Sequence, residues 1–145
     1  SLPRPNRFIP RTLELCPELS EEAKLGPRIE KPIDPPSLLI NDECGRLFHR
    51  LDDRYALPQS NLNLLIRNAA TQNSKTSDGW EYDPKASLQS SILSGVFSEA
   101  MAQETYDADL AGLYWSLTLG GSGIRLHCSG FSDRLPDLAS KILGE

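Results

Sequence analysis

The sequence is poor in the residues that hold metals or act as nucleophiles beside an activating base. Its 145 residues include only two histidines and three cysteines. Three cysteines in a chain of this length do not form the framework of a disulfide-stapled secreted domain. We therefore expect a reduced, intracellular protein in the cytoplasm.

Long apolar runs and an excess of basic charge are also missing. No stretch approaches the roughly 20 apolar residues that cross a bilayer, and the opening residues Ser-Leu-Pro-Arg-Pro lack the apolar core of a signal peptide. Fifteen Lys and Arg against 20 Asp and Glu give a net charge of −5. Binding to a phosphate backbone requires the opposite balance. We expect neither a membrane nor a nucleic acid as a partner.

What is present fits one soluble domain behind a proline-rich lead. Apolar residues make up 39% and charged residues 24%, which is ordinary for a globular protein. Eight of the eleven prolines lie in the first 36 residues. Proline removes an N–H donor and favours extended geometry before it, so neither a long helix nor a central strand fits there.

This lead, residues 1–36, is predicted to be an extended strap. It holds apolar side chains that a free linker would not need: Phe8, Ile9, Leu13 and Leu15. We expect the strap to lie on a protein surface, either one of this chain or one that the chain lacks.

Alternating apolar and polar residues predict strands in the remainder, residues 37–145. The pattern occurs over residues 47–51, 62–66, 113–119 and 124–129, and it indicates strands with one buried face. Gly-Gly-Ser-Gly at positions 120–123 predicts a tight hairpin between the last two. Residues 70–82 are rich in Asn, Ser, Thr and Asp, which predicts an exposed loop.

Two helices are predicted between and after these strands. The first begins at Asp83-Pro84 and ends near Gly112, and the second is capped by Ser132 or Asp133. The expected inner face of the first helix recurs every four residues and is widened by three more: Leu88, Ile92, Val96 and Ala100, with Leu93, Phe97 and Met101. That of the second consists of Leu135, Leu138, Ala139 and Ile142. The predicted class is α+β, an antiparallel sheet with helices packed on one face.

Candidate metal and nucleophile pairs exist, but none is favoured. Cys44 with His49, or His127 with Cys128, offers too few ligands for zinc. His127 and Cys128 are also adjacent on a predicted strand, so their side chains point to opposite faces and cannot easily share one metal ion. A Cys-His nucleophile would use Cys16 or Cys44, without any sign of an activated thiol. The glycines at 120–123 lack the lysine of a phosphate-binding loop. We expect no catalytic, cofactor-binding or metal-binding residue in this chain.

Two surface features could also bind a ligand or a partner, but other interpretations compete with that one. The acidic residues Glu14, Glu18, Glu21 and Glu22 are expected to be a solvated face rather than a cation site, because Lys24 and Arg28 dilute their charge. Trp80 and Tyr82 in the polar loop either anchor a partner or pack back onto the domain.

Four segments, in order, resemble insulinase-type (pitrilysin-type, inverzincin) zinc metallopeptidases. Residues 6–10 read Asn-Arg-Phe-Ile-Pro, like the family's Asn-x-Phe-Ile-Pro. Residues 47–58 contain Asp-Asp-Arg-Tyr-Ala-Leu-Pro, like Asp-Asp-x-Phe-x-x-Pro, and Leu62-Asn63 follows at the expected place. Residues 106–113 read Tyr-Asp-Ala-Asp-Leu-Ala-Gly-Leu, and residues 130–133 read Gly-Phe-Ser-Asp where the family has Gly-Tyr-Asn-Asp.

The resemblance implies where the chain would lie in such a peptidase. Residues 1–36 would be an interdomain strap that joins the second domain to the third, and residues 37–145 the first half of the third, or middle, domain, an α/β roll. The family's zinc is held by His-x-x-Glu-His in the first domain, with the glutamate activating a bound water. The two histidines of this chain, 78 residues apart, do not match that motif.

We therefore expect a non-catalytic structural segment of an insulinase-like zinc metalloendopeptidase that helps to form the wall of its substrate chamber. Its partners would be the remaining domains of the longer protein (the parent) and the parent's peptide substrates, and Zn²⁺ would be bound by the parent's first domain. Whether the chain counts as an enzyme stays open, since it holds no catalytic motif. The alternative is a free-standing scaffold or protein-interaction domain of the same fold.

Overall fold

The computed structural model describes residues 4–26, 30, 32–67, 75–76, 79–80, 84–120 and 123–144. The chain forms two compact units. The large unit joins Ser1–Leu13 to Gln59–Glu145, and the small unit is Glu14–Pro58. The proline-rich lead is therefore divided, because its first part belongs to the same unit as the C-terminal half of the chain.

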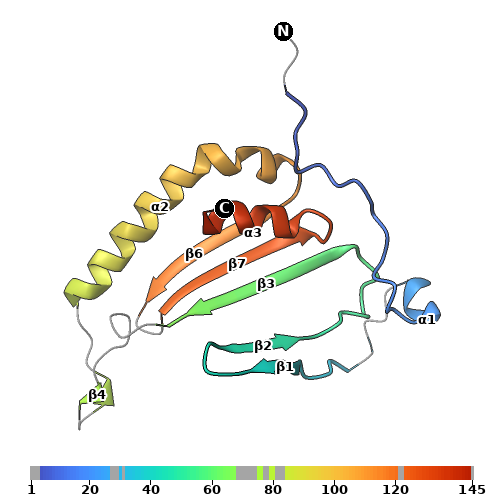
Figure 1. Cartoon of the computed structure of the whole chain (residues 1–145), viewed down its shortest axis with the longest axis horizontal. Helices are drawn as coiled ribbons and strands as arrows, with labels where there is room; N and C mark the ends of the chain where they lie inside the picture. The colour runs from blue at the N-terminus through green and yellow to red at the C-terminus, as the bar shows by residue number, and fades with distance from the viewer. Residues whose placement is uncertain are drawn as a thin grey trace. The chain divides into compact units, whose positions relative to one another are not determined.

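A three-stranded antiparallel sheet forms the base of the large unit (Figure 1). Its strands are β3 (Gln59–Ile66), β6 (Tyr114–Gly120) and β7 (Gly123–Phe131), in the order β3-β7-β6. β6 and β7 pair up to Gly120 and Gly123, so the predicted hairpin is confirmed. Its expected turn residues Gly121 and Ser122 lie outside the described residues.

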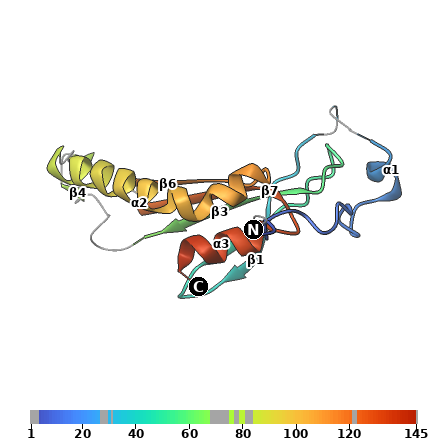
Figure 2. The ribbon, with the colours of Figure 1, turned by 90° about the horizontal axis from the view of Figure 1, so that it is seen from above.

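Two helices cover one face of this sheet (Figure 1, Figure 2). α2 (Pro84–Leu110) packs on β6, α3 (Leu135–Leu143) packs on β7, and the two helices touch each other. Lys141 of α3 forms an ion pair with Glu104 of α2, and this hydrogen bond lowers the pKa of the glutamate. The predicted α+β class is confirmed. No described helix combines the length and the apolar character needed to cross a membrane.

The core lies between the sheet and the helices, where alternation along the strands places every second residue. Leu126 and Cys128 of β7 face inward, while His127 between them lies on the other face. The buried cluster comes from the N-terminal segment, α2 and the residues after it, β7 and α3: Phe8, Ala108, Leu113, Leu126, Cys128, Leu135, Leu138 and Ile142. The expected inner face of α3 is confirmed, since all four of its residues are buried.

The inner face of α2 matches only part of the predicted one: Phe97 and Met101 pack against the core, whereas the four-residue repeat does not. Ile92 and Val96 are 58% and 61% exposed, and Leu88 and Leu93 are exposed as well. Each step of four residues advances about 40° beyond a full helical turn, so a strict four-residue repeat drifts off one face. Positions with mixed spacing of three and four stay on the buried side: Ser94, Phe97, Met101, Thr105 and Ala108.

The end of α2 is confirmed near Gly112, which has a φ of 77°. The Leu113 N–H donates to the Ala108 carbonyl and the Gly112 N–H to that of Asp109, each at 3.0 Å. These two bonds form a Schellman motif, which closes a helix through a left-handed residue. Glycine adopts that conformation without strain.

The beginning of α3 differs from the prediction. Arg134 occupies the N-cap position, and no side chain caps the helix there. Ser132 bonds to Ser60, and Asp133 accepts a hydrogen bond from the Arg11 backbone instead. The two expected capping side chains are thus engaged by distant parts of the chain. Asp83, the expected cap of α2, lies outside the described residues.

The small unit contains α1 (Glu21–Lys24) and an antiparallel hairpin of β1 (Ser37–Asn41) and β2 (Arg46–His49). The predicted strand over residues 47–51 is confirmed for its first part. Its predicted buried face is wrong, because Leu47 is 46% exposed and His49 is exposed as well. Among the described residues these two strands pair only with each other.

The stretch predicted as a loop, residues 70–82, contains a small pairing of β4 (Lys75–Thr76) with β5 (Gly79–Trp80). The remaining residues of that stretch lie outside the described ones.

Candidate functional site

Three of the segments that resemble the peptidase family meet at one corner of the large unit. Gly130, at the end of β7, lies against the end of α2. A Cβ on Gly130 would stand 2.6 Å from the carbonyl oxygen of Gly112 and 2.7 Å from Leu113 Cδ2. Gly130 has a φ of 137°, which only glycine adopts easily. Two of these segments, 106–113 and 130–133, thus pack closely against each other at this corner.

The N-terminal segment docks at the same corner. Phe8 is 1% exposed and belongs to the core cluster. Asn6 Nδ2 donates to the Asp107 carbonyl at 2.6 Å, and Arg134 Nε donates to the Ile9 carbonyl at 3.2 Å. The first part of the lead therefore lies on a surface of this chain, which is one of the two alternatives that the sequence left open.

Electrostatics at the corner favour an ionised Asp133. Its Oδ2 accepts a hydrogen bond of 2.7 Å from the Arg11 N–H and lies 3.6 Å from Arg134 Nε. The backbone hydrogen bond from Arg11, helped by the positive charges of Arg134 and Arg11, lowers the pKa of the Asp133 carboxyl. Arg134 also contacts Asp137 Oδ2 at 2.8 Å. Because these polar groups bind one another, we interpret them as contacts that hold the N-terminal segment in place.

The histidine-cysteine neighbours on β7 do not form a site together. His127 Nδ1 lies 2.9 Å from Asn63 Oδ1 across the strand pair, on the face without helices. Cys128 is buried on the opposite face, and burial raises the pKa of its thiol. The prediction that the two point to opposite faces is confirmed.

The other candidates lie in the small unit. Cys44 is in the β1–β2 turn, where the Asp42 carboxylate accepts from the Cys44 N–H at 2.9 Å, and His49 ends β2. Cys16 is half-buried, and all three thiols are free. Within the residues that the structure describes, no group of three or more His, Cys, Asp and Glu side chains could hold a metal ion.

The acidic residues of the lead are solvent-facing or paired. Glu14, Glu18, Glu21 and Glu22 are mostly exposed, and Glu21 accepts a hydrogen bond of 2.7 Å from Lys24. Of the loop aromatics, Trp80 lies in β5 and Tyr82 falls outside the described residues, so their expected role stays a prediction.

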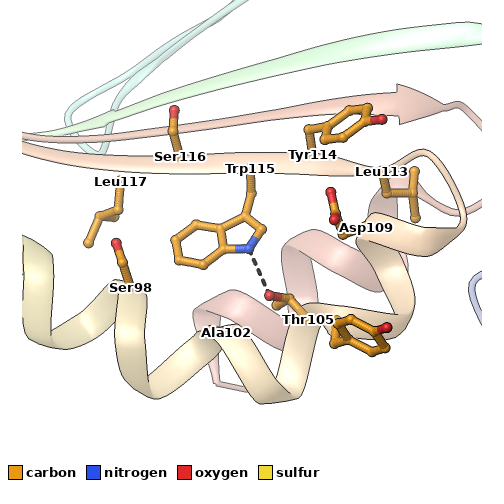
Figure 3. A pocket seen from close by; sticks show the side chains of 10 residues that line it. Ser98, Ala102, Thr105, Asp109, Leu113, Tyr114, Trp115, Ser116 and Leu117 are labelled. Atoms are coloured by element: carbon orange, nitrogen blue, oxygen red, sulfur yellow. Dashed lines mark hydrogen bonds between the residues drawn. The ribbon is translucent and has the colours of Figure 1, made fainter.

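A groove that the sequence did not indicate runs between α2 and β6 (Figure 3). Its volume is about 470 Å³. One wall consists of α2 side chains: Ser98, Ala102, Thr105, Tyr106 and Asp109. The other wall consists of Leu113 and of residues 114–117 on both faces of β6, so the groove follows the edge of the strand.

Trp115 determines the shape of this groove. Its indole Nε1 donates to Thr105 Oγ1 at 3.0 Å (Figure 3). Its ring also meets the Phe97 ring edge-on, with centroids 5.9 Å apart. The alternation over residues 113–119 places Trp115 on the predicted buried face of the strand, and its ring packs against the core cluster. The only sequence signal for the groove is the row of small and polar residues on α2, and such a row is common on helices.

Comparison with known proteins matches the entire chain. The model of the family described as the middle or third domain of peptidase M16 covers residues 1–145. The chain is 30% identical to mug138 of Schizosaccharomyces pombe over 98% of its own length and 13% of that protein's. It is 26% identical to the A-factor-processing enzyme of Saccharomyces cerevisiae, covering 99% of this chain and 12% of the enzyme.

Other relatives and a solved structure agree. Human insulin-degrading enzyme is 26% identical over 98% of this chain, which corresponds to 12% of that enzyme. A crystal structure of pitrilysin has the same fold, with a TM-score of 0.70 at 21% identity, over 99% of this chain and 13% of pitrilysin. The chain thus spans about one eighth of the relatives that it matches, and it belongs to the family of middle, or third, domains of M16 peptidases, as the four segments predicted.

Proposed function

We propose that this chain is a non-catalytic structural segment of an insulinase-type zinc metalloendopeptidase, where it forms part of the wall of the substrate chamber. The observation that carries the proposal is the match of all 145 residues to the middle-domain family in a chain without the His-x-x-Glu-His motif. Peptide hydrolysis would belong to the parent, with Zn²⁺ in its first domain.

The geometry of the large unit supports a role in shape and positioning. One face of its sheet is covered by helices, and the other face carries polar side chains such as Asn63, Arg125 and His127. A polar sheet face can line a water-filled chamber without the cost of exposing apolar surface. Rigid placement of a substrate contributes to rate even when the wall supplies no reacting group.

We further propose that residues 1–36 connect the parent's second domain to its third and that residues 37–145 form the first half of that third domain. The anchoring of Phe8 in the core supports this connection, since it fixes the N-terminal part of the segment to the body of the proposed third domain. The partners would be the remaining domains of the parent and its peptide substrates.

A peptidase assay on the pure 145-residue chain tests the absence of catalysis. We expect cleavage of a fluorogenic peptide at the rate of buffer alone, with or without added zinc. Hydrolysis that requires zinc and stops on addition of a chelator would refute the proposal.

The alternative from another class is a free-standing scaffold or interaction domain of the same fold. The exposed apolar residues of α2, among them Leu88 and Ile92, favour the segment, because a self-sufficient domain seldom leaves such a row uncovered. Sedimentation and unfolding experiments discriminate the two. A monomer with one cooperative transition would favour the scaffold, and self-association would favour the segment.

A further inference from the structure

The side of α2 that faces away from the sheet carries a continuous row of exposed side chains (Figure 1). Successive residues of a helix are about 100° apart, so positions spaced by three and four stay within one arc of about 80°. On the outer side of α2 this arc holds Lys85, Leu88, Ile92, Val96, Glu99, Gln103, Tyr106 and Leu110. All of these residues are exposed, so the row is open to a partner.

The first five positions of this outer row are symmetric about Ile92. They follow one another at spacings of three, four, four and three residues: Lys85, Leu88, Ile92, Val96 and Glu99. Their chemistry is symmetric too. An apolar residue lies four positions to either side of Ile92, and a charged residue of opposite sign lies seven positions to either side. The row is therefore complementary to its own reversed copy.

Such symmetry suits a second copy of the same helix packed antiparallel. A two-fold axis through Ile92 brings together positions that are equally far from it in the sequence. Leu88 then meets Val96 of the second copy, and Lys85 meets Glu99 of the second copy at each end. The mean spacing of about 3.5 residues is also that of the seam between two coiled helices.

Charge disfavours the competing arrangements of two such helices. A parallel pair places Lys85 beside Lys85 and Glu99 beside Glu99, which repel each other. An antiparallel pair centred between Val96 and Glu99 places the carboxylate of Glu99 against the apolar side chain of Val96. The register centred on Ile92 avoids both costs, and unfavourable alternatives are what make a helix pair specific.

We propose that two copies of this chain associate through the outer row of α2, antiparallel and centred on Ile92, with Lys85 of each copy beside Glu99 of the other. The apolar side chains that drive the association are more than half exposed in the single chain: Leu88, Ile92 and Val96. Tyr106 and Leu110 lie beyond the paired stretch. The surface and its register go beyond the proposed function, which does not specify what covers α2.

Sedimentation equilibrium of the full 145-residue chain measures the association. We expect a monomer–dimer equilibrium with a dissociation constant on the order of 10 µM, because the paired stretch is smaller than a standard interface. Ile92→Lys should weaken the dimer at least about thirtyfold, since it places two like charges at the centre of an apolar contact. Leu93→Lys is the matched control, because Leu93 is equally exposed but points about 100° away from Ile92. This variant should leave the association unchanged.

Exchange of the two charges tests the register. Glu99→Lys alone should weaken the dimer about tenfold, because both ion pairs become lysine pairs. Lys85→Glu alone should have a similar effect. The double variant with both changes should bind within about twofold of the unaltered chain, because the pairs are restored with their signs reversed. Asp107→Lys is the control for net charge, since Asp107 is exposed and lies beyond the paired stretch.

A chain that stays monomeric at millimolar concentration would refute the proposal. Equal dimer strength in Ile92→Lys and Leu93→Lys would place the contact on another surface, and failure of the double charge exchange to restore binding would exclude this register. Unfolding curves at concentrations far below the dissociation constant show whether each variant folds as a single chain. None of these outcomes alters the expected lack of peptidase activity, which is measured separately.

Discussion

At the corner of the large unit, two residues are glycines that neighbouring atoms approach closely, and a third residue contributes a charge. Gly130 leaves room for the Gly112 carbonyl, and Gly112 leaves room for the ring of Phe131 at 3.4 Å. Asp133 adds a charge that holds the Arg11 backbone. Both kinds of residue act through a partner that is distant in the sequence.

Replacing Gly130 by alanine should destabilise the large unit by more than about 2 kcal/mol, since the new methyl group meets backbone at 2.6 Å and the φ of 137° is strained for alanine. Urea unfolding followed by tryptophan fluorescence measures the change. Gly95→Ala is the control, because that glycine lies in α2 with open space around it. There the substitution should stabilise by about 0.5–1 kcal/mol. Equal effects at both positions would contradict the packing argument.

The lowered pKa of Asp133 predicts how the docking of the N-terminal segment depends on pH. A carboxyl with a depressed pKa in the folded state stabilises that state above its unfolded pKa, and this contribution is lost as pH falls through the folded value. We expect the Arg11 amide resonance to shift as the pH falls below about 4. In Asp133→Asn the resonance should stay constant over that range. An unchanged titration in the variant would show that another group is responsible.

Which face of a helix or strand is buried depends on the element that packs against it. α2 has apolar residues on two sides, and the sheet covers only the side of Phe97 and Met101. The row at Leu88, Ile92 and Val96 remains exposed within the described structure. A helix with apolar residues on both sides cannot reveal from its own sequence which side is inner.

Alanine substitutions on the two sides of α2 test this assignment. Phe97→Ala should cost at least about 2 kcal/mol of unfolding free energy, because it removes the edge contact with Trp115 and opens a void. Val96→Ala, one residue away and 61% exposed, should change it by less than about 0.5 kcal/mol. Chemical unfolding of both variants gives the comparison. A larger loss for Val96→Ala would restore the four-residue stripe as the inner face.

The whole molecule depends on a long-range connection at its N-terminus. Residues 1–13 join the large unit although 45 residues, Glu14–Pro58, separate the two parts of that unit in the chain. Phe8 completes the core that α2, β7 and α3 share. Removing the segment would therefore open the core rather than merely shorten a tail.

Phe8→Ala should destabilise the large unit by about 3–5 kcal/mol, the usual cost of deleting a buried aromatic ring. Thermal unfolding and hydrogen exchange of the core amides in β7 are the measurements. Ile9→Ala serves as the control, since Ile9 is 57% exposed and its carbonyl still accepts from Arg134. If Phe8→Ala changed stability no more than Ile9→Ala, the segment would be an attached strap and not part of the core.

Several elements could be derived from local pattern. The period-two stretches became β3, β6 and β7, Gly120 and Gly123 pair where β6 meets β7, and α3 has the inner face that its spacing indicates. The family was recognisable from four short motifs in order along the chain, three of which meet at one corner of the large unit. These features depend on neighbours in the sequence, and their physics is that of single strands, turns and helix ends.

Long-range packing determined the remaining features. The inner face of α2, the burial of Phe8, the engagement of Asp133 by Arg11 and the groove along β6 each require two segments that are far apart in the chain to meet. The free energy that selects among such arrangements comes from surfaces brought together on folding, and it is not present in either segment alone. For this reason the strands and helices could be read from the order of the residues, while the core partner of each face could be seen only after the chain had folded.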